Sequence, residues 1–593
     1  MKKLRLLKLS GPVRLCGQRT YLSNELRYLV WDGYPLGFLP SNFHPQNLVE
    51  LQLPSSPIKQ ISTAISSSNK LKSLRLSCCR YLKETPDLSS LPCLERLHLM
   101  ECVNLVKVHL SSGVHSRLGR VRLDGCIKLS NLPRSIQWTN LVEFHLSGCV
   151  KLENFPEIQG DMDRLDRLYL GNSGINGLPS SFEHLSGLQV LDLTGCQKLK
   201  NVPNNIFCRM KRLHSLYMER VAMTQLPSSI EHLSKLGILY FSHFQKQYTK
   251  HTKHFQMPFS FLGKRKRGNS TYLHLEMLSG LCNVTRLQLS NCNLSEESFP
   301  NDISSLSFLK YLDVSENNFV HIPASFIQLR KLGWIDLEHC RSLRTLTSLP
   351  PSIRYVNAHG CESLERYWIP SSEKSPDKRI FIFSECHKLV MDERNNMPSI
   401  SPESQPQENF GIIYPATEIP HWCSHKIEEE ERFKEGSGFQ RRKYIGDHYN
   451  NVKGIFVCAV CVDVSKFANE LSRSVLIELK INGYPLPDLG FSFENLSNQA
   501  AIFTHTAEYY DMDEKDFRPI INLMKKKPKL SEGPPNICDD SCCIEATIRF
   551  QNMNVKKWGI HIVMESEQAK TSEQGSCRMG SEDEKKIELI VSP

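Results

Sequence analysis

The sequence of 593 residues lacks several features that would place it in a familiar class. It has no uninterrupted apolar run of about 18 residues, so no membrane span is expected. Its basic start has an apolar run broken by Arg5 and Lys8, which argues against a secretion signal. It has no G-x-x-x-x-G-K-[ST] motif, and therefore no P-loop for nucleotide phosphates. The net charge of +10 is mild over this length and does not indicate nucleic-acid binding. Because neither a membrane span nor a secretion signal is expected, we expect a cytosolic or nuclear protein.

Cysteine, by contrast, is abundant, and 21 residues is a high number for a reducing compartment. Cys458 and Cys461 form a C-x-x-C on a predicted strand, where the two side chains face opposite ways. No second pair stands at a zinc-site spacing. Cys538–Cys543 is expected to be a loop, and Cys423 with His425 is not expected to be a catalytic pair. The sequence therefore predicts no catalytic residue, no metal site and no cofactor.

A nine-residue template, L-x-x-L-x-L-x-x-C, recurs through residues 1–370. Successive copies start 21 to 25 residues apart, except for one spacing of 48 between Leu236 and Val284. This is the period of leucine-rich repeats. The fifteen copies start at Leu4, Leu26, Leu48, Leu71, Leu94, Leu118, Leu141, Leu165, Leu188, Leu213, Leu236, Val284, Leu309, Leu332 and Ile353.

The alternation within the template predicts the fold. In the x-L-x-L part the leucines face one way and the intervening residues the other. One repeat cannot bury its leucines alone, whereas stacked repeats give a continuous parallel sheet over an aliphatic core. Segments such as Leu226–Leu236 and Ile322–Leu332 are expected to return the chain over the convex side in short helical turns. The predicted fold is therefore an α/β leucine-rich-repeat solenoid, a horseshoe with a parallel sheet.

The ninth template position is predicted to be structural. It follows the strand, where the chain turns and backbone groups need partners. Asparagine can donate there, and a thiol can donate weakly while it packs as a small apolar group. Metal binding would need converging ligands, whereas these thiols lie one per repeat, so they are expected to be reduced. The predicted cysteine ladder consists of Cys79, Cys102, Cys126, Cys149, Cys196, Cys292, Cys340 and Cys361, with Asn317 as the alternative residue.

The fifth template position, between the two strand leucines, is predicted to form a concave binding face. From the N-terminal repeats onward the series is first basic, then aromatic and finally acidic. Aromatic residues and arginine often carry the binding energy of protein interfaces, and charged ends would orient a partner. The alternative is that any solvated sheet face needs polar residues. The series is Arg75, His98, Arg122, His145, Tyr169, Asp192, Tyr217, Tyr240, Gln288, Asp313 and Asp336, with Trp334 beside the last.

A basic loop, residues 242–283, is expected to interrupt the solenoid at the long spacing. Two interpretations of its charge cluster stay open: a solvated loop, or a nuclear import signal. The cluster consists of Lys264, Arg265, Lys266 and Arg267.

Beyond residue 370 the leucine period stops. Residues 371–407 are rich in Ser, Pro, Glu and Asn, which is typical of a linker or capping segment. Residues 408–567 contain strand-like runs separated by polar turns, which predicts an all-β antiparallel sandwich. Residues 568–593 are polar and are expected to be disordered.

Particular stretches resemble plant intracellular immune receptors of the Toll/interleukin-1-receptor, nucleotide-binding, leucine-rich-repeat (TIR-NB-LRR) class. Leu26–Ile61 ("LRYLVWDGYPLGFLPSNFHPQNLVELQLPSSPIKQI") and Leu82–His109 are similar to their early repeats. Leu349–Glu365 ("LPPSIRYVNAHGCESLE") resembles their last repeat. "ATEIPHWCSH" at Ala416–His425 resembles the opening of their C-terminal jelly-roll/Ig-like domain, and Val555–Glu567 resembles its closing strand. The opening departs from the family pattern, because Ala416-Thr417 replaces Gly-Ser and Cys423 replaces an aromatic residue.

The resemblance implies a recognition function. In that family the repeats and the C-terminal domain together recognise a pathogen effector or a guarded host protein, and the contact relieves inhibition of a nucleotide-binding switch. The NAD-cleaving signalling domain and the switch are not recognisable here, so no enzymatic activity is expected. Met1 is either an internal methionine of a longer gene or the start of a truncated relative.

Alternative functions stay open at this point. A ubiquitin ligase or its substrate adaptor would need an F-box helix pair or a reactive cysteine in the C-terminal region, and neither is recognisable. A cell-surface ectodomain would need a signal sequence and cysteine-paired caps. A truncated chain would act as a decoy or as a regulatory partner of a complete receptor.

Overall fold

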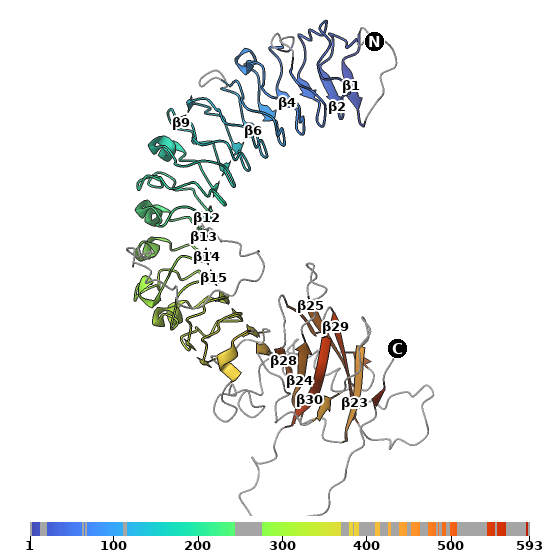
Figure 1. Ribbon diagram of the computed structural model, residues 1–593, viewed down its shortest axis with the longest axis vertical. Helices are drawn as coiled ribbons and strands as arrows, with labels where there is room; N and C mark the ends of the chain where they lie inside the picture. The colour runs from blue at the N-terminus through green and yellow to red at the C-terminus, as the bar shows by residue number, and fades with distance from the viewer. Residues whose placement is uncertain are drawn as a thin grey trace, which may run out of the picture. The chain divides into compact units, whose positions relative to one another are not determined.

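The computed structural model describes residues 3–11, 21–61, 65, 68–110, 116–243, 275–368, 379–383 and 385–390, and strand segments between 410 and 590 (Figure 1). It divides into two compact units. Unit 1 is Met1–Asn317 with Pro323–Leu332, and unit 2 is Asn318–Ile322 with Gly333–Pro593. The charge cluster Lys264–Arg267 lies outside the described residues.

Unit 1 is a ladder of parallel strands, one per repeat, and each strand pairs with that of the next repeat. β13 pairs directly with β14, so the spacing of 48 residues is one repeat with a long insertion. The strands are β1 (Leu6–Leu9), β2 (Tyr28–Trp31), β3 (Glu50–Gln52), β4 (Ser73–Arg75), β5 (Arg96–His98), β6 (Arg120–Arg122), β8 (Glu143–His145), β10 (Arg167–Tyr169), β11 (Val190–Asp192), β12 (Ser215–Val221), β13 (Ile238–His243), β14 (Arg286–Gln288) and β15 (Tyr311–Asp313).

The register of this sheet builds the core of unit 1. It places the fourth template position of one repeat opposite that of the next, as for Leu74 and Leu97. Both side chains are fully buried, as are the residues at the first and sixth positions of the same repeats. The solenoid of stacked parallel strands predicted from the leucine period is therefore confirmed.

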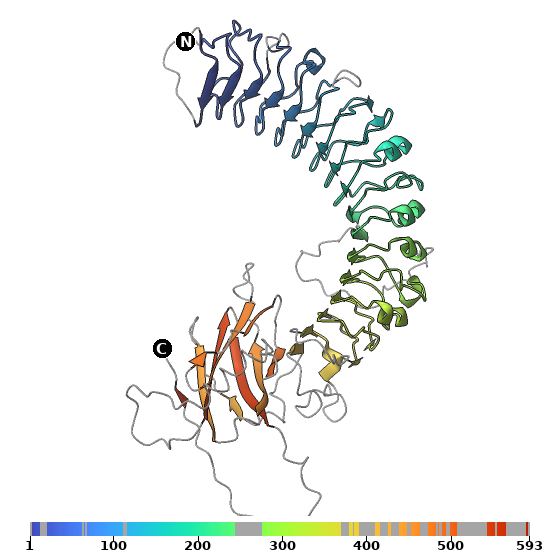
Figure 2. The ribbon, with the colours of Figure 1, turned by 180° about the vertical axis from the view of Figure 1, so that it is seen from behind.

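The outer side of unit 1 carries short 3-10 turns and two-residue strands, opposite the strand side in both views (Figure 2). Buried aromatic residues on these turns pack between repeats, as Phe182 does against Phe155 with ring centroids 5.4 Å apart. The elements are η2 (Leu88–Ser90), η3 (Ser180–His184), η4 (Ser228–His232), η5 (Glu276–Gly280), η6 (Glu296–Ser298) and η7 (Ala324–Gln328), with β7 (Ser135–Ile136) pairing β9 (Glu157–Ile158).

The α component of the predicted α/β class is not seen, because the described residues contain no α-helix. The physical reason is the short repeat. After the strand and its turn, too few residues remain for several α-helical turns, and a 3-10 turn spans the distance with a larger rise per residue. Proline immediately before η3, η4 and η7 fixes the entry to these turns.

Unit 2 begins with parallel strands that continue the repeat pattern. β16 (Trp334–Asp336) pairs with β18 (Tyr355–Asn357), and β18 with β20 (Arg379–Ile382). The template search missed β20 because Lys378, not an aliphatic residue, occupies its first position. The Arg379 side chain is buried, and it donates from Nε to the carbonyl of Ile353 at 3.1 Å. In addition, β17 (Thr345–Leu346) pairs with β19 (Arg366–Tyr367), and η8 (His387–Val390) follows β20.

The C-terminal strands of unit 2 form antiparallel pairs, except that β21 lies parallel to β20. One set contains β21 (Phe410–Tyr414), β28 (Gln499–Thr506), β24 (Val452–Val462), β30 (Asn554–Met564) and β22 (His425–Glu428), paired in that order. A second set contains β25 (Arg473–Ile481), which pairs with β26 (Tyr484–Pro485), β27 (Leu489–Phe493) and β29 (Cys542–Gln551), and β23 (Gly438–Gly446), which pairs with β29 and β31 (Leu589–Ile590). Strand-rich structure is thus present, and the jelly-roll/Ig-like assignment stays a prediction, as do the predicted boundaries.

A left-handed residue follows nearly every strand of the repeats. The eighth template position has positive φ in these repeats, for example 76° at Gly148 and 62° at Cys78. This conformation turns the chain sharply out of the sheet, so that the ninth residue points back under the strand. Glycine adopts it without a steric penalty, whereas other residues are strained there by roughly 1–2 kcal/mol.

We expect Gly148→Ala to destabilise unit 1 by about 1 kcal/mol, because an added Cβ disfavours the left-handed conformation. A Cβ there would have no neighbour closer than 3.4 Å, so backbone strain alone is tested. Gly119 is the matched control: its φ is not positive and its nearest neighbour would lie at 3.7 Å. The measurement is the urea unfolding midpoint, and equal effects of Gly148→Ala and Gly119→Ala would contradict the prediction.

Candidate functional site on the strand side of the repeats

Residues at the fifth template position of unit 1 form one continuous row. Each strand contributes one such residue, and the parallel register aligns it with the next, as in Arg75, His98 and Arg122. The row continues through His145, Tyr169, Asp192, Tyr217, Tyr240, Gln288 and Asp313. The structure therefore brings the predicted binding residues of unit 1 together on the strand side, about 4.8 Å apart from strand to strand. Asp336 and Trp334 lie on β16 in unit 2.

The basic end of the row is built around His98. Arg75 donates from Nε to His98 Nδ1 at 3.3 Å. Burial, together with the positive charges of Arg75, Arg122, Arg96 and Arg120, lowers the pKa of His98 to about 4. His98 is thus neutral near pH 7, and it separates two arginines of the row without cancelling their charge.

Arginines at the third template position were missed by the sequence analysis, although they face the same side as the fifth. Arg96 lies 3.7 Å from Glu95, and Arg120 lies 3.6 Å from Glu143. The strand alternation of period two was the signal that would have found them. Arg75 and Arg122, by contrast, make no ion pair within the described part of the chain, so their charges are not neutralised by a neighbouring carboxylate.

Aromatic rings follow the basic end. The rings of His145 and Tyr169 lie 4.5 Å apart, and Tyr217 meets Tyr240 edge-on at 5.4 Å. In unit 2 the exposed Trp334 stacks on Tyr355 with centroids 3.5 Å apart and an interplanar angle of 18°. Aromatic pairs of this kind often occur where protein partners bind.

The acidic residues of the row have a structural role that the sequence analysis did not predict. Asp192 Oδ1 accepts a hydrogen bond from the backbone N–H of Thr194 at 2.9 Å. Asp313 and Asp336 accept equivalent bonds from residues two positions onward, Ser315 and Glu338. Each carboxylate therefore ends its own strand by forming an Asx turn. Their negative charge adds to that of the strand side, but the Asx-turn hydrogen bonds explain why aspartate occurs there without a binding partner.

The ladder residues lie buried beneath the turns and bond to the preceding repeat. Cys126 Sγ donates to the carbonyl of Leu99 at 3.1 Å, and Cys149 repeats this with Leu123 at 3.2 Å. The acceptor in each case is the sixth residue of the preceding template. Cys79, Cys102, Cys196, Cys292, Cys361 and the additional Cys386 make the same contact, and Cys340 is also buried.

Burial makes these thiols chemically inert. It raises the pKa of Cys79 to about 11 and that of Cys149 and Cys386 to about 12. The thiolate is the reactive form, so little of it is present at neutral pH. Cys386 was missed by the template search for the same reason as β20. The structural role of the ladder stays a prediction, which these contacts support.

Asn317 fills the same position with more hydrogen bonds. Its Nδ2 lies within hydrogen-bonding distance of the carbonyl of Leu289 at 2.8 Å, and its Oδ1 accepts from the N–H groups of Cys292 and Leu294 at 3.1 and 2.9 Å. A carboxamide thus serves three backbone groups of the preceding repeat, whereas a thiol satisfies one carbonyl.

The His98 environment predicts a pH effect. The pKa is lower in the folded chain than the ordinary value of 6.5, so the stability linked to neutral His98 is complete above pH 6.5 and declines as the pH falls towards 4. We expect the 13C-labelled His98 ring to be neutral at pH 6 by NMR, and Arg75→Gln to raise its pKa. Lys151→Gln, at an exposed residue outside the strands, is the control. Titration of His98 near pH 6.5 would disprove the assignment.

The ladder predicts unequal costs for two truncations. Asn317→Ala should lower the free energy of unfolding by about 3 kcal/mol, since three buried backbone groups of the preceding repeat lose their partners. Cys126→Ala should cost about 1–2 kcal/mol, since one weak bond and a small volume are lost. Urea unfolding of the full chain tests both, with the exposed Cys282→Ala as control. A larger effect for Cys126→Ala than for Asn317→Ala would show that the hydrogen bonds do not set the order.

Within the described residues no helix has the length and apolar character needed to cross a membrane. Among solved structures, a leucine-rich-repeat protein of Leptospira interrogans aligns with 59% of this chain and 88% of its own length, at 20% identity and a TM-score of 0.37. The fold assignment rests instead on the strand register and on the family match below.

Comparison with known proteins identifies the relatives. The family model described as disease resistance protein RPS4B-like leucine-rich repeats matches residues 138–213 and 184–387. Disease resistance-like protein DSC1 of Arabidopsis thaliana is 33% identical over 69% of this chain and 35% of its own length. TMV resistance protein N of Nicotiana glutinosa is 32% identical over 63% and 32%. The chain spans about a third of the length of these relatives. They are plant resistance proteins of the TIR-NB-LRR class that the sequence resembles, and the chain belongs to the leucine-rich-repeat disease resistance proteins of plants.

Proposed function

We propose that this chain is a recognition module that binds an acidic surface of a partner protein, a pathogen effector or a host protein that effectors target. The observation that carries the proposal is the pair Arg75 and Arg122, which lie two strands apart on one face with a neutral His98 between them. Two carboxylates at a similar spacing on a partner would pair with both arginines. The aromatic pairs farther along the strand side would supply apolar contact area.

Electrostatic repulsion among the arginines favours the binding of an acidic partner. Four arginines close to one histidine repel each other, and among the described residues only the two at the third template position form ion pairs with a carboxylate. No ion pair among the described residues uses the charges of Arg75 and Arg122, and an acidic partner would relieve the repulsion. Complementary charges of this kind mainly raise the association rate and fix the orientation of a partner.

The remaining parts of the proposal follow from the family. No step of catalysis is assigned to these residues, and the module works in the cytoplasm, with entry to the nucleus if the cluster Lys264–Arg267 serves as an import signal. In a complete receptor, partner binding would be transmitted to signalling domains. A chain lacking such domains would instead compete for the same partner.

Charge reversal tests the proposal. Candidate partners are effectors and host proteins that associate with the chain in plant tissue. We expect Arg75→Glu and Arg122→Glu each to weaken binding at least tenfold, mostly through slower association, and to reduce its salt dependence. Lys151→Glu applies the same change at an exposed residue outside the strands. Surface plasmon resonance at two ionic strengths measures the association and dissociation rate constants. Unchanged binding in both arginine variants would refute the proposal.

A further inference from the structure

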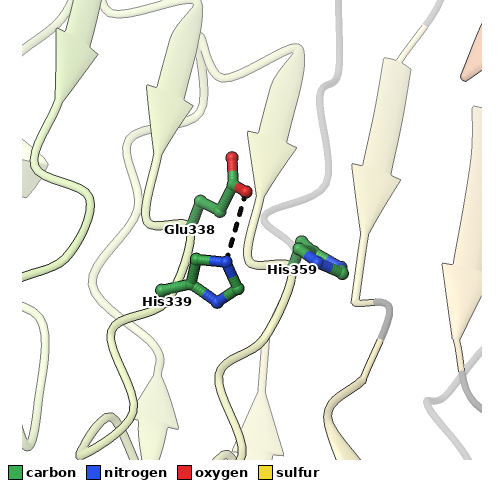
Figure 3. A group of neighbouring side chains, drawn as sticks. All are labelled: Glu338, His339 and His359. Atoms are coloured by element: carbon green, nitrogen blue, oxygen red, sulfur yellow. Dashed lines mark ion pairs between the residues drawn. The ribbon is translucent and has the colours of Figure 1, made fainter. Parts of the chain in front are cut away.

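Three metal-ligating side chains meet at the ends of two neighbouring strands in unit 2. Glu338 and His339 follow β16, and His359 follows β18 (Figure 3). One ligand atom of each lies within 4.8 Å of the other two. Glu338 Oε1 and His339 Nε2 are 3.5 Å apart, close to the roughly 3.4 Å expected between two ligands of a tetrahedral zinc ion. Bringing in His359 needs a movement on the order of 1 Å, which a side-chain rotation provides.

Neighbouring groups hold these ligands in place. Glu385, on the turn after β20, lies 3.9 Å from His359 Nε2, so a further carboxylate lies near one imidazole. Asn357 Nδ2 lies 3.4 Å from the second oxygen of Glu338. The ring of His339 covers Gly360, where an added Cβ would overlap its Nδ1 atom. Carboxylate-backed histidines and hydrogen-bonded carboxylates are the supporting contacts that metal ligands usually have.

The fold itself does not require these residue types. At the seventh and eighth template positions, which Glu338 and His339 occupy, other repeats carry varied residues, such as Ser147 and Gly148 or Met100 and Glu101. Here two imidazoles and a carboxylate replace them within two consecutive turns. His359 is largely buried, so its ring has a defined position rather than sampling solvent.

We propose that Glu338, His339 and His359 bind one first-row divalent cation, with zinc as the preferred ion. Two imidazoles and one carboxylate form a known zinc donor set and leave a position for water. The ion would bridge the turns after β16 and β18, and its charge would offset that of Asp336, Glu338 and Glu385. The site shares no residue with the pair Arg75 and Arg122, so loss of zinc binding and loss of partner binding can be measured independently.

Zinc titration of the metal-stripped full chain tests this site, with a chromophoric chelator as competitor. We expect His339→Asn and His359→Asn each to remove one zinc per chain or to weaken its binding at least tenfold. Asparagine suits position 339, whose φ is 55°. Cobalt supplies a second readout: the wild-type site should give a visible d–d spectrum without the sulfur charge-transfer band that thiolate ligands produce.

The control is His232→Asn, because His232 and Glu231 form an exposed pair 3.9 Å apart that contains a single histidine. This variant should bind zinc as the wild type does. Zinc should raise the thermal unfolding midpoint of the wild type and the control, but not of the two site variants. Circular dichroism without metal verifies that all variants fold. Equal zinc affinity and stoichiometry in wild type and site variants, or a cobalt spectrum dominated by sulfur ligation, would overturn the proposal.

Discussion

Aliphatic side chains stacked in register by a parallel sheet are the interaction on which the rest of this structure depends. Leu74 and Leu97 are opposite one another and fully buried, and the same arrangement recurs in the neighbouring repeats. Each such leucine contributes about 2 kcal/mol on burial. Because the leucines of each repeat must align with those of the next, the backbone has to turn out of the sheet after each strand in the same conformation.

That requirement explains the turns. A left-handed residue at the eighth position reverses the chain, and the ninth residue then lies under the strand, where it meets a carbonyl of the preceding repeat. A small side chain with a hydrogen-bond donor fits there, and cysteine and asparagine are two solutions of different strength. Nine of the 21 cysteines occupy this position, and backbone geometry would account for them without disulfides.

The same geometry leaves the strand side available for recognition. Side chains at the third and fifth template positions do not pack into the aliphatic core, so arginine, tyrosine and tryptophan are tolerated there. The aspartates show that this freedom is partial, because Asp192 and Asp313 also bond to the turns that end their strands. Charge on this face therefore reflects in part the demands of the turns, whereas Arg75 and Arg122 form no ion pair among the described residues.

The sequence by itself determined the solenoid, the positions of the ladder thiols and the row that begins at Arg75, because a period of fixed length states which residues share a face. It did not determine β20 with Cys386, where Lys378 breaks the pattern, nor the 3-10 character of the outer turns. The neutral state of His98 and the approach of His339 to His359 were decided only by the tertiary structure. Both depend on distances between residues of different repeats, and the linear pattern gives their alignment but neither the side-chain rotamers nor the burial that sets their chemistry.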